Sequence, residues 1–485
     1  MMRRRLGFVV VWALVGSAGC GGGSGGADVR PDPGSDLAAD LGEGGDFRET
    51  DSRERPDGGP TDPVPNLDGP EPAETRDGEG AEDVAVPDPG APEDAPGDLA
   101  REVEDDANPG DPGVDPGPGI DPGPGGCARD PAPADRPRWV VVSLPYGSGG
   151  SRTPDWTLLR LGTDGNLSWT GERFTMGRAT GGVVAFTPDG RLGIAVQEDG
   201  SLGVFAIEED GLVRVVHEGF RGGFYGDQVR VVGEGSRALV LDAEWAESGG
   251  GVHQVDILCD GTLRDQGRRL PARLPRALLP LPGGPFLLAA WFPEGLPAEA
   301  GDVHLYDLDG TPRRLGGGQA FPDDAIIGGA AATADGSLVL LGDVSEFSGR
   351  DTAIAVMEVR GDSLEKRQVI SPFEDPVSIV AAPRGGTLLA ASGYGDALWV
   401  LEQVPGEPDS PIRVRGRLAT PGGKPQLPGS MVVVERGALA GRVLVVEVTG
   451  IRQVHLSADG SATDLGVTSL GGGVEGIPGA LGIQP

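Results

Sequence analysis

Three aspartates stand at or just beyond the ends of apolar runs, where carboxylates can take part in chemistry. Asp242 closes one run, and Asp343 and Asp396 fall in the connections that follow two others. Carboxylates that converge can act as an acid–base pair or bind Ca²⁺. The sequence does not fix the distances between them, so the alternative that they are solvated loop charges stays open.

The histidines and short motifs specify no reaction. The chain has four histidines, His217, His253, His304 and His455, and each lies in or beside a short apolar run. The sequence contains no His-Glu-x-x-His and no Cys-x-x-Cys, the spacings typical of zinc sites. Its single Gly-x-Ser-x-Gly, at residues 22–26, lies in a glycine-rich stretch rather than at a strand-to-helix turn. We therefore predict that the histidines are ordinary strand residues.

Charge and composition divide the 485 residues after Gly126. The net charge is −34, and residues 21–126 alone hold 29 acidic and 6 basic side chains together with 18 prolines. Such acidity repels phosphate backbones and anionic lipids, which excludes a nucleic-acid binder and a basic-patch membrane protein. We expect residues 20–126 to form a disordered acidic linker, because their few apolar side chains cannot offset the conformational entropy of folding. Cation binding by this tract is the alternative.

The first twenty residues, MMRRRLGFVVVWALVGSAGC, combine three arginines, a short apolar run and small residues before a cysteine. The run is shorter than the roughly twenty residues that a spanning helix needs, and it indicates an export signal. Its end resembles a bacterial lipoprotein signal. The resemblance implies a signal peptide over residues 1–19, lipidation of Cys20 and anchoring in the cell envelope, at the outer membrane or cell surface. Cleavage after Ala18, which leaves Cys20 as a thiol, is the alternative.

From Trp139 onward, short alternating or fully apolar runs separated by tight turns predict β-strands. Asp-Gly supplies the positive backbone dihedrals that such turns need. One class of turn recurs at roughly 45 to 50 residues, a spacing typical of propeller blades. The turns that share this signature are Thr163-Asp164-Gly165, Pro188-Asp189-Gly190, Glu209-Asp210-Gly211, Cys259-Asp260-Gly261, Leu308-Asp309-Gly310, Ala334-Asp335-Gly336 and Ala458-Asp459-Gly460.

The strand signals predict an all-β, seven-bladed propeller over residues 127–485. The opening segment, 139–176, offers only three strands, and Val474–Leu481 is predicted to supply its missing inner strand, so that both termini close the ring. Six complete units of four strands lie between them, at residues 182–220, 226–270, 275–318, 326–371, 377–420 and 430–470.

The repeat resembles the seven-bladed propellers of the lactonase and quinoprotein amine dehydrogenase type. Their blades often carry a Pro-Asp-Gly turn after the innermost strand, and the best copy here is Phe186-Thr187-Pro188-Asp189-Gly190. The resemblance implies the fold. It does not select a function, because this architecture is used by hydrolases, lyases, dehydrogenases and scaffolds.

The predicted blades have strands A to D from the centre outward. Their A–B and C–D turns lie on one face, here called the turn face, and their B–C and D–A connections lie on the other, the loop face. The loop-face connections are longer and more varied, and such loops are where proteins most often bind or react. Aromatic and acidic side chains there would suit a sugar, a peptide or a cation, although the tryptophans could instead pack between blades. The predicted ligand-binding residues are Tyr225, Asp242, Trp245, Trp291, Asp343, Tyr394 and Asp396.

Two cysteines remain beside Cys20. Cys127 and Cys259 form an even pair in an exported, oxidising environment. Cys259 sits at a C–D turn, and Cys127 precedes a strand that starts on the same face. Twelve residues from Cys127 to Trp139 can span about 40 Å. We predict a disulfide; the alternative is two thiols that never meet.

These observations favour a surface-tethered lipoprotein whose propeller binds a protein or glycan partner at the cell envelope, as a monomer and without catalysis or cofactor. An alternative role for the aspartates is to bind Ca²⁺ at the mouth of the central channel. The alternative function is an enzyme of the lactone hydrolase or lyase kind, with carboxylates at the mouth of the central channel.

Overall fold

The computed structural model describes residues 127–146, 152–179, 181–243, 249–290, 303–308, 310–321, 325–344, 352–470 and 478–485. Among these residues no helix is long and apolar enough to cross a membrane. The predicted signal peptide, Cys20 and the predicted linker lie outside the described residues.

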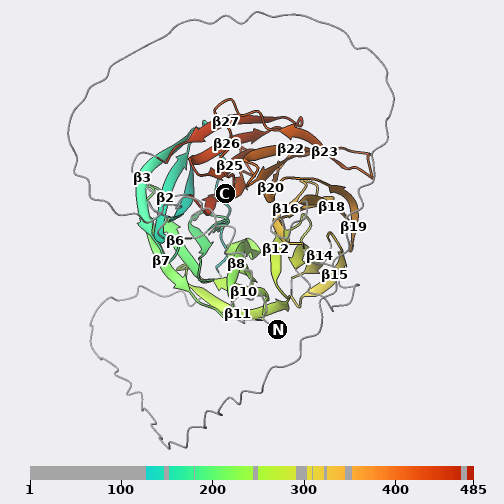
Figure 1. Ribbon diagram of the computed structural model, residues 1–485. Helices are drawn as coiled ribbons and strands as arrows, with labels where there is room; N and C mark the ends of the chain where they lie inside the picture. The colour runs from blue at the N-terminus through green and yellow to red at the C-terminus, as the bar shows by residue number, and fades with distance from the viewer. Residues whose placement is uncertain are drawn as a thin grey trace, which may run out of the picture. The chain divides into compact units, whose positions relative to one another are not determined.

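The described strands form seven four-stranded antiparallel sheets, set around a common axis as the blades of a propeller. Blade 1 combines the first strands with the last, and blades 2 to 7 follow in chain order (Figure 1). The predicted all-β, seven-bladed fold is confirmed.

In each blade the two middle strands, B and C, carry most of the fully buried side chains. The A strands, which line the axis, are β28 (Leu481–Ile483), β4 (Ala185–Phe186), β8 (Gly226–Val232), β12 (Pro275–Pro280), β16 (Ile327–Ala332), β20 (Pro376–Ala381) and β24 (Met431–Val433). The B strands are β1 (Arg138–Tyr146), β5 (Leu192–Val196), β9 (Arg237–Asp242), β13 (Phe286–Ala290), β17 (Leu338–Asp343), β21 (Thr387–Ser392) and β25 (Arg442–Glu447).

The two outer strands of each blade become more polar from the C strand to the D strand. The C strands are β2 (Arg152–Leu161), β6 (Leu202–Ile207), β10 (Gly251–Ile257), β14 (Val303–Asp307), β18 (Ala353–Arg360), β22 (Ala397–Gln403) and β26 (Gly450–Leu456). The D strands are β3 (Leu167–Thr175), β7 (Val213–Phe220), β11 (Leu263–Pro271), β15 (Arg313–Gly318), β19 (Ser363–Ile370), β23 (Ile412–Arg417) and β27 (Ala462–Thr468). One short 3-10 turn, η2 (Gly233–Gly235), joins β8 to β9.

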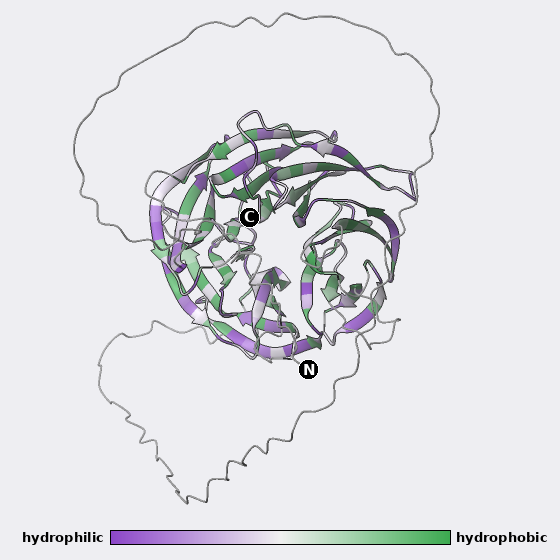
Figure 2. Ribbon diagram, viewed as in Figure 1, coloured by the Kyte–Doolittle hydropathy of each residue, from purple (hydrophilic) through white to green (hydrophobic). Residues whose placement is uncertain are grey.

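An apolar cluster fills the space between each pair of neighbouring blades. Between blades 1 and 2, for example, Trp156 packs near Phe174 and Phe205, and both Trp156 and Phe205 are fully buried. The outer strands instead alternate hydrophilic and hydrophobic residues (Figure 2). This alternation explains the sequence pattern, because each outer strand faces a neighbouring blade on one side and solvent on the other.

The last strand closes the ring. In β28, Leu481 pairs with Val142 and Ile483 pairs with Val140 of β1. The predicted closure by both termini is therefore confirmed, but the bounds predicted for the closing strand, Val474–Leu481, are wrong: β28 is Leu481–Ile483 and shares only Leu481 with them. Residues 474–477 lie outside the described part of the chain. Just before the strand, the Gly479 amide donates to the Ser143 carbonyl of β1 (2.9 Å) and the Ser143 amide donates to the Ala480 carbonyl (3.0 Å), while the Ala480 amide turns to the Ser143 hydroxyl (2.6 Å). Pro478 has no amide hydrogen to donate.

Residues 127–137 cross the turn face as an extended strap. The Cys127 amide donates to the Ile257 carbonyl in blade 3 (2.9 Å), and the Ala132 amide donates to the Pro188 carbonyl in blade 2 (2.8 Å). The Asp135 carboxylate then accepts from the Ala438 amide in blade 7 (2.8 Å). The strap thus ties together turns from three blades before the chain enters β1.

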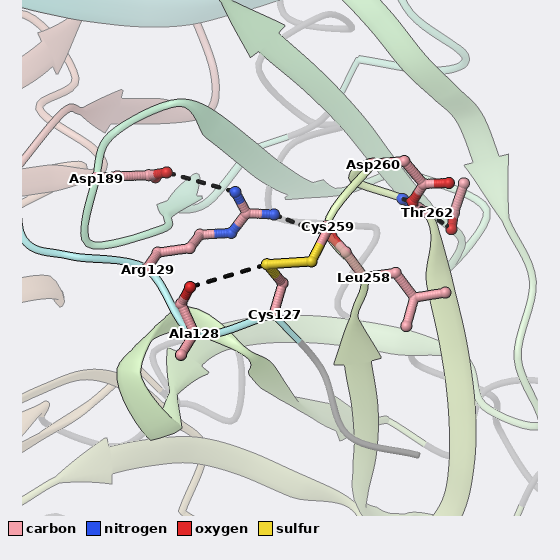
Figure 3. Close-up of a disulfide and its surroundings, with 8 residues drawn as sticks. All are labelled: Cys127, Ala128, Arg129, Asp189, Leu258, Cys259, Asp260 and Thr262. Carbon is pink, nitrogen blue, oxygen red and sulfur yellow. Dashed lines mark hydrogen bonds and ion pairs between the residues drawn. A yellow bond between two sulfur atoms is a disulfide. The ribbon is translucent and has the colours of Figure 1, made fainter. Parts of the chain in front are cut away.

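A disulfide joins the beginning of the strap to the C–D turn of blade 3. Cys127 and Cys259 have Cα atoms 4.9 Å apart and are separated by 132 residues. Closing a loop of that length restricts the unfolded chain enough to stabilise the fold by about 4 to 5 kcal/mol in the chain-entropy model. Figure 3 shows Arg129 beside this bond, where its guanidinium donates to the Leu258 carbonyl (2.9 Å) and lies 3.4 Å from the Asp189 carboxylate.

The Asp-Gly turns are held by the aspartate side chain. In blade 5, the Asp335 carboxylate accepts from the Thr333 hydroxyl (2.6 Å), the Ser337 amide (3.0 Å) and the Ser337 hydroxyl (2.8 Å), while Gly336 takes a positive φ of 69°. Partial burial alone would raise the pKa of Asp335, but these hydrogen bonds outweigh it and lower the pKa from 3.8 to about 2.

We predict that Asp335 stabilises the fold in a pH-dependent way. Because its pKa is lower in the folded state, the contribution is full above about pH 4 and is lost as the pH falls towards 2. Asp335→Ala should therefore lower the free energy of unfolding at neutral pH, and the gap from the wild type should narrow below pH 4. Urea unfolding across this range measures the gap, with Asp362→Ala, in an exposed turn of the same blade, as the control. A gap that is constant with pH would contradict the prediction.

Candidate functional site

The structure places the predicted site residues at the loop face. Asp242 and Asp343 are the last residues of the B strands β9 and β17, and Tyr225 lies in the D–A connection that enters β8. Tyr394 and Asp396 lie in the tight B–C turn of blade 6. Trp245 and Trp291 lie outside the described residues.

Asp242 and Asp343 do the same structural task in two different blades. The Asp343 carboxylate accepts from the Ile326 amide (3.3 Å), and the Asp242 carboxylate accepts from the Tyr225 amide (3.1 Å). Each aspartate therefore anchors the D–A connection that leads into the inner strand of its own blade. Both side chains are almost completely buried.

Asp396 anchors a connection in the neighbouring blade. Its carboxylate accepts from the Leu427 amide (2.8 Å) and from the Lys424 ammonium (3.1 Å), both in the D–A connection between blades 6 and 7. Asp343, which the sequence predicts in the connection after its strand, is instead the last residue of β17, and its carboxylate turns towards Ile326. Within the described ranges, no three His, Cys, Asp or Glu side chains are grouped so as to hold a metal ion.

Tyr225 is a packing residue between blades 2 and 3. Its hydroxyl donates to the Glu198 carbonyl (2.6 Å), and its ring lies against Gly200, where any side chain would collide with it. Burial is the main reason that the pKa of Tyr225 is raised, and the nearby carboxylates of Asp199, Glu198 and Asp227 add to the effect.

Of the predicted aromatics that the structure describes, Tyr394 is the one that faces solvent, with 40% of its surface exposed. Its neighbours in the turn, Gly393 and Gly395, lie against Asp375 and Glu374. Glu374 binds Arg417 with contacts of 2.6 and 2.8 Å, and the Arg417 guanidinium lies 5.1 Å from the centre of the Trp399 ring. We call Glu374, Tyr394, Asp396, Arg417 and Lys424 the blade 6 surface.

Sequence reasoning missed Glu374, Trp399 and Arg417. Glu374 and Arg417 lie 43 residues apart and meet only because blade 6 brings its D–A entry beside the end of its outer strand. A strand-ending arginine that follows an exposed turn was the available signal. It is weak, because an arginine, Arg360, also ends the C strand β18.

Charged side chains also stand on the inner strands of blades 3 and 4, where the channel opens at the loop face. Gln228 donates to the Arg276 carbonyl (2.8 Å) and accepts from the Leu278 amide (3.3 Å), so it satisfies the free edge of β12. Asp227 is partly exposed to the solvent in the central channel, but the protein around its carboxyl group excludes much of the water. This desolvation raises its pKa, and the neighbouring Arg276 opposes the rise.

We predict that Asp343 is a structural anchor. Asp343→Ala leaves the Ile326 amide without this acceptor and should destabilise the fold by about 1 to 3 kcal/mol. Asp343→Asn keeps an acceptor oxygen and should destabilise the fold clearly less than Asp343→Ala. Thermal unfolding of the two variants measures the difference, and equal behaviour of Asn and Ala would contradict the anchoring role.

No family model matches the chain, and no curated protein sequence matches it. The fold is similar to that of solved propellers at low identity, and each of the following covers 72% of this chain. They are a protein from Lactobacillus plantarum (TM-score 0.53, 11% identity, 100% of that chain), a putative 6-phosphogluconolactonase from Bacteroides uniformis (0.52, 15%, 99%) and a periplasmic gluconolactonase from Pseudomonas aeruginosa (0.51, 14%, 99%). At these identities the likeness establishes the seven-bladed propeller fold alone.

Proposed function

We propose that this protein is an exported, lipid-anchored lipoprotein whose propeller binds a protein or glycan partner through its loop face. The observation that carries the proposal is the blade 6 surface. An exposed aromatic ring stands there among two ion pairs, Glu374–Arg417 and Asp396–Lys424. Aromatic and arginine side chains supply most of the binding energy in many interfaces.

The hydrogen bonds of the loop-face aspartates also support binding rather than catalysis. Asp242, Asp343 and Asp396 each accept a backbone amide from a D–A connection. A carboxylate that holds a loop in place contributes to a preformed surface. A catalytic acid–base pair would instead direct two such groups at one substrate position.

The point where the chain enters the propeller fits a tethered role. The strap begins at Cys127 on the turn face, and the disulfide to Cys259 fixes that point. A lipid on Cys20, with the acidic segment as spacer, would attach the domain through this face. The loop face lies on the opposite side of the blades and would stay open to a partner.

A lactone hydrolase is the second candidate. Two of the similar solved structures are described as lactonases, and Asp227 beside Arg276 places a carboxyl group of raised pKa next to a guanidinium in the channel. Such a pair could move a proton while the arginine holds an anionic substrate group.

Photo-crosslinking in cells tests the binding proposal. Tyr394→p-benzoylphenylalanine should form adducts with envelope material, and Arg417→Ala in the same chain should reduce their yield about tenfold, as loss of an interface arginine commonly does. Leu212→p-benzoylphenylalanine is the matched control, because Leu212 is 65% exposed on the turn face. Equal yields of adducts at positions 394 and 212 would contradict the proposal.

A hydrolysis assay with the purified, detergent-solubilised chain distinguishes the binding proposal from the enzyme alternative. We expect no acceleration of gluconolactone or 6-phosphogluconolactone hydrolysis over buffer. Acceleration that Asp227→Asn abolishes would overturn the binding proposal in favour of the hydrolase.

Anchoring is tested separately by cell fractionation. The wild-type chain should sediment with membranes and take up radiolabelled palmitate, whereas Cys20→Ala should do neither, because a lipidated cysteine holds the protein at the bilayer. Unchanged sedimentation of the Cys20→Ala variant would contradict lipidation at this residue.

A further inference from the structure

Blades 3, 4 and 7 carry a basic side chain at the same position of the C strand. His253 pairs with Val240, His304 with Leu288 and Arg452 with Val445, and each of these partners stands two residues before the end of its B strand. The shared register allows the surroundings of the three side chains to be compared residue by residue.

In blade 7 the cation is permanent and lies between two acids. The Arg452 guanidinium is bound by Glu447, at the end of the B strand, and by Asp464 of the D strand (2.8 Å). It also donates to the Gly423 carbonyl (3.0 Å), in the D–A connection that enters the blade. Arg452 and both acids are buried, so the cation compensates two acidic groups while it fixes the connection.

In blade 3 the same three positions hold Asp242, His253 and Asp265. The His253 side chain is 4% exposed, with Nε2 3.5 Å from Asp242 Oδ2 and Nδ1 3.8 Å from Asp265 Oδ1. Both ring nitrogens are buried, and neither makes a hydrogen bond within the described residues. An imidazolium has two N–H donors and could serve both carboxylates, as the guanidinium does in blade 7.

The two carboxylates of blade 3 hold the D–A connection at residues 221–225. Asp242 accepts from the Tyr225 amide (3.1 Å), and Asp265 accepts from the Gly223 amide (2.8 Å). Phe224, between them, packs against the His253 ring with centroids 5.3 Å apart. The position of this connection therefore depends on the two carboxylates between which His253 lies.

Blade 4 shows the same position without the acids. Ala290 replaces the acid at the end of the B strand, and Arg314 replaces the acid on the D strand, opposite Tyr306. A histidine at this position is thus flanked by two acids in blade 3 and by none at the equivalent sites in blade 4.

We propose that His253 is a pH-dependent counterion for residues 221–225. Protonated His253 forms ion pairs with Asp242 and Asp265 and tightens the connection that they anchor, and deprotonation removes these ion pairs, so the connection loosens. Imidazole groups change charge between about pH 5 and 8. The stabilisation is present at the acidic end of this range and is lost as the pH rises. The inference does not depend on the proposed function.

Other charged groups surround this position. Arg268 of β11 is the cross-strand neighbour of His253, while Arg221 of the connection is 71% exposed and is bound to Asp199 of blade 2. His217 of β7 is separated from His253 by the rings of Phe220 and Phe224. The carboxylates of Asp242 and Asp265 lie 3.5 and 3.8 Å from the two ring nitrogens.

Hydrogen exchange of the full-length, detergent-solubilised chain, followed by mass spectrometry, tests the proposal. After correction for intrinsic rates, amides of residues 221–225 should exchange about tenfold more slowly at about pH 5.5 than at about pH 8. Residues 423–426, fixed by Arg452 in the same molecule, are the internal control and should show no such change. Equal protection of residues 221–225 at both pH values would overturn the proposal without recourse to any variant.

Two substitutions assign the effect to His253. His253→Arg reproduces the permanent cation of blade 7 and should make the protection of residues 221–225 independent of pH. His304→Gln, at the equivalent position of blade 4, should retain the wild-type pH dependence. A pH dependence that persists in His253→Arg, or disappears in His304→Gln, would overturn the proposal.

Discussion

The hydrogen-bonded pairing of β28 with β1 is the constraint on which the rest of the propeller depends. A blade is stable only when an apolar cluster fills the space on each of its sides, and blade 1 lacks an inner strand until Leu481–Ile483 pairs with β1. Closure therefore joins residues from the two ends of the described chain and seals the clusters that blade 1 shares with blades 7 and 2. The strap adds to this closure, because it connects turns of blades 3, 2 and 7.

Within this ring, acidic side chains of the loop face mainly fix backbone. Asp242 and Asp343 bind amides of their own D–A connections, and Glu447 with Asp464 binds the arginine that fixes another. The loops therefore rest on the ends of the B strands, where Asp242, Asp343 and Glu447 are buried. A binding surface built on such supports is preformed, and it loses little conformational entropy when a partner binds.

Much of the fold follows from local sequence. The sequence predicts strands at Leu192–Val196 and Leu202–Ile207, which are the bounds of β5 and β6, because apolar residues fill both strands and Asp-Gly turns mark their ends. For the next strand it predicts Leu212–Val216, whereas β7 runs to Phe220, because its alternating polar residues give a weaker signal.

The candidate site could be predicted only in part. Tyr394 was assigned to an exposed loop-face turn from its place between two strand signals. The partners of Asp242 and the Glu374–Arg417 pair depend on cross-strand register and on contacts between residues 17 and 43 positions apart. Neither the cross-strand register nor contacts between such distant residues can be derived from a local sequence pattern.

The bond between Cys127 and Cys259 also has a mechanical consequence. Any pull transmitted along the N-terminal segment reaches the propeller at Cys127, and the covalent link passes that load to the C–D turn of blade 3. The force therefore reaches neither the strap nor β1, whose hydrogen bonds to β28 close the ring. Tension can pass through the sulfur bridge while the seam between the two ends of the chain stays unloaded.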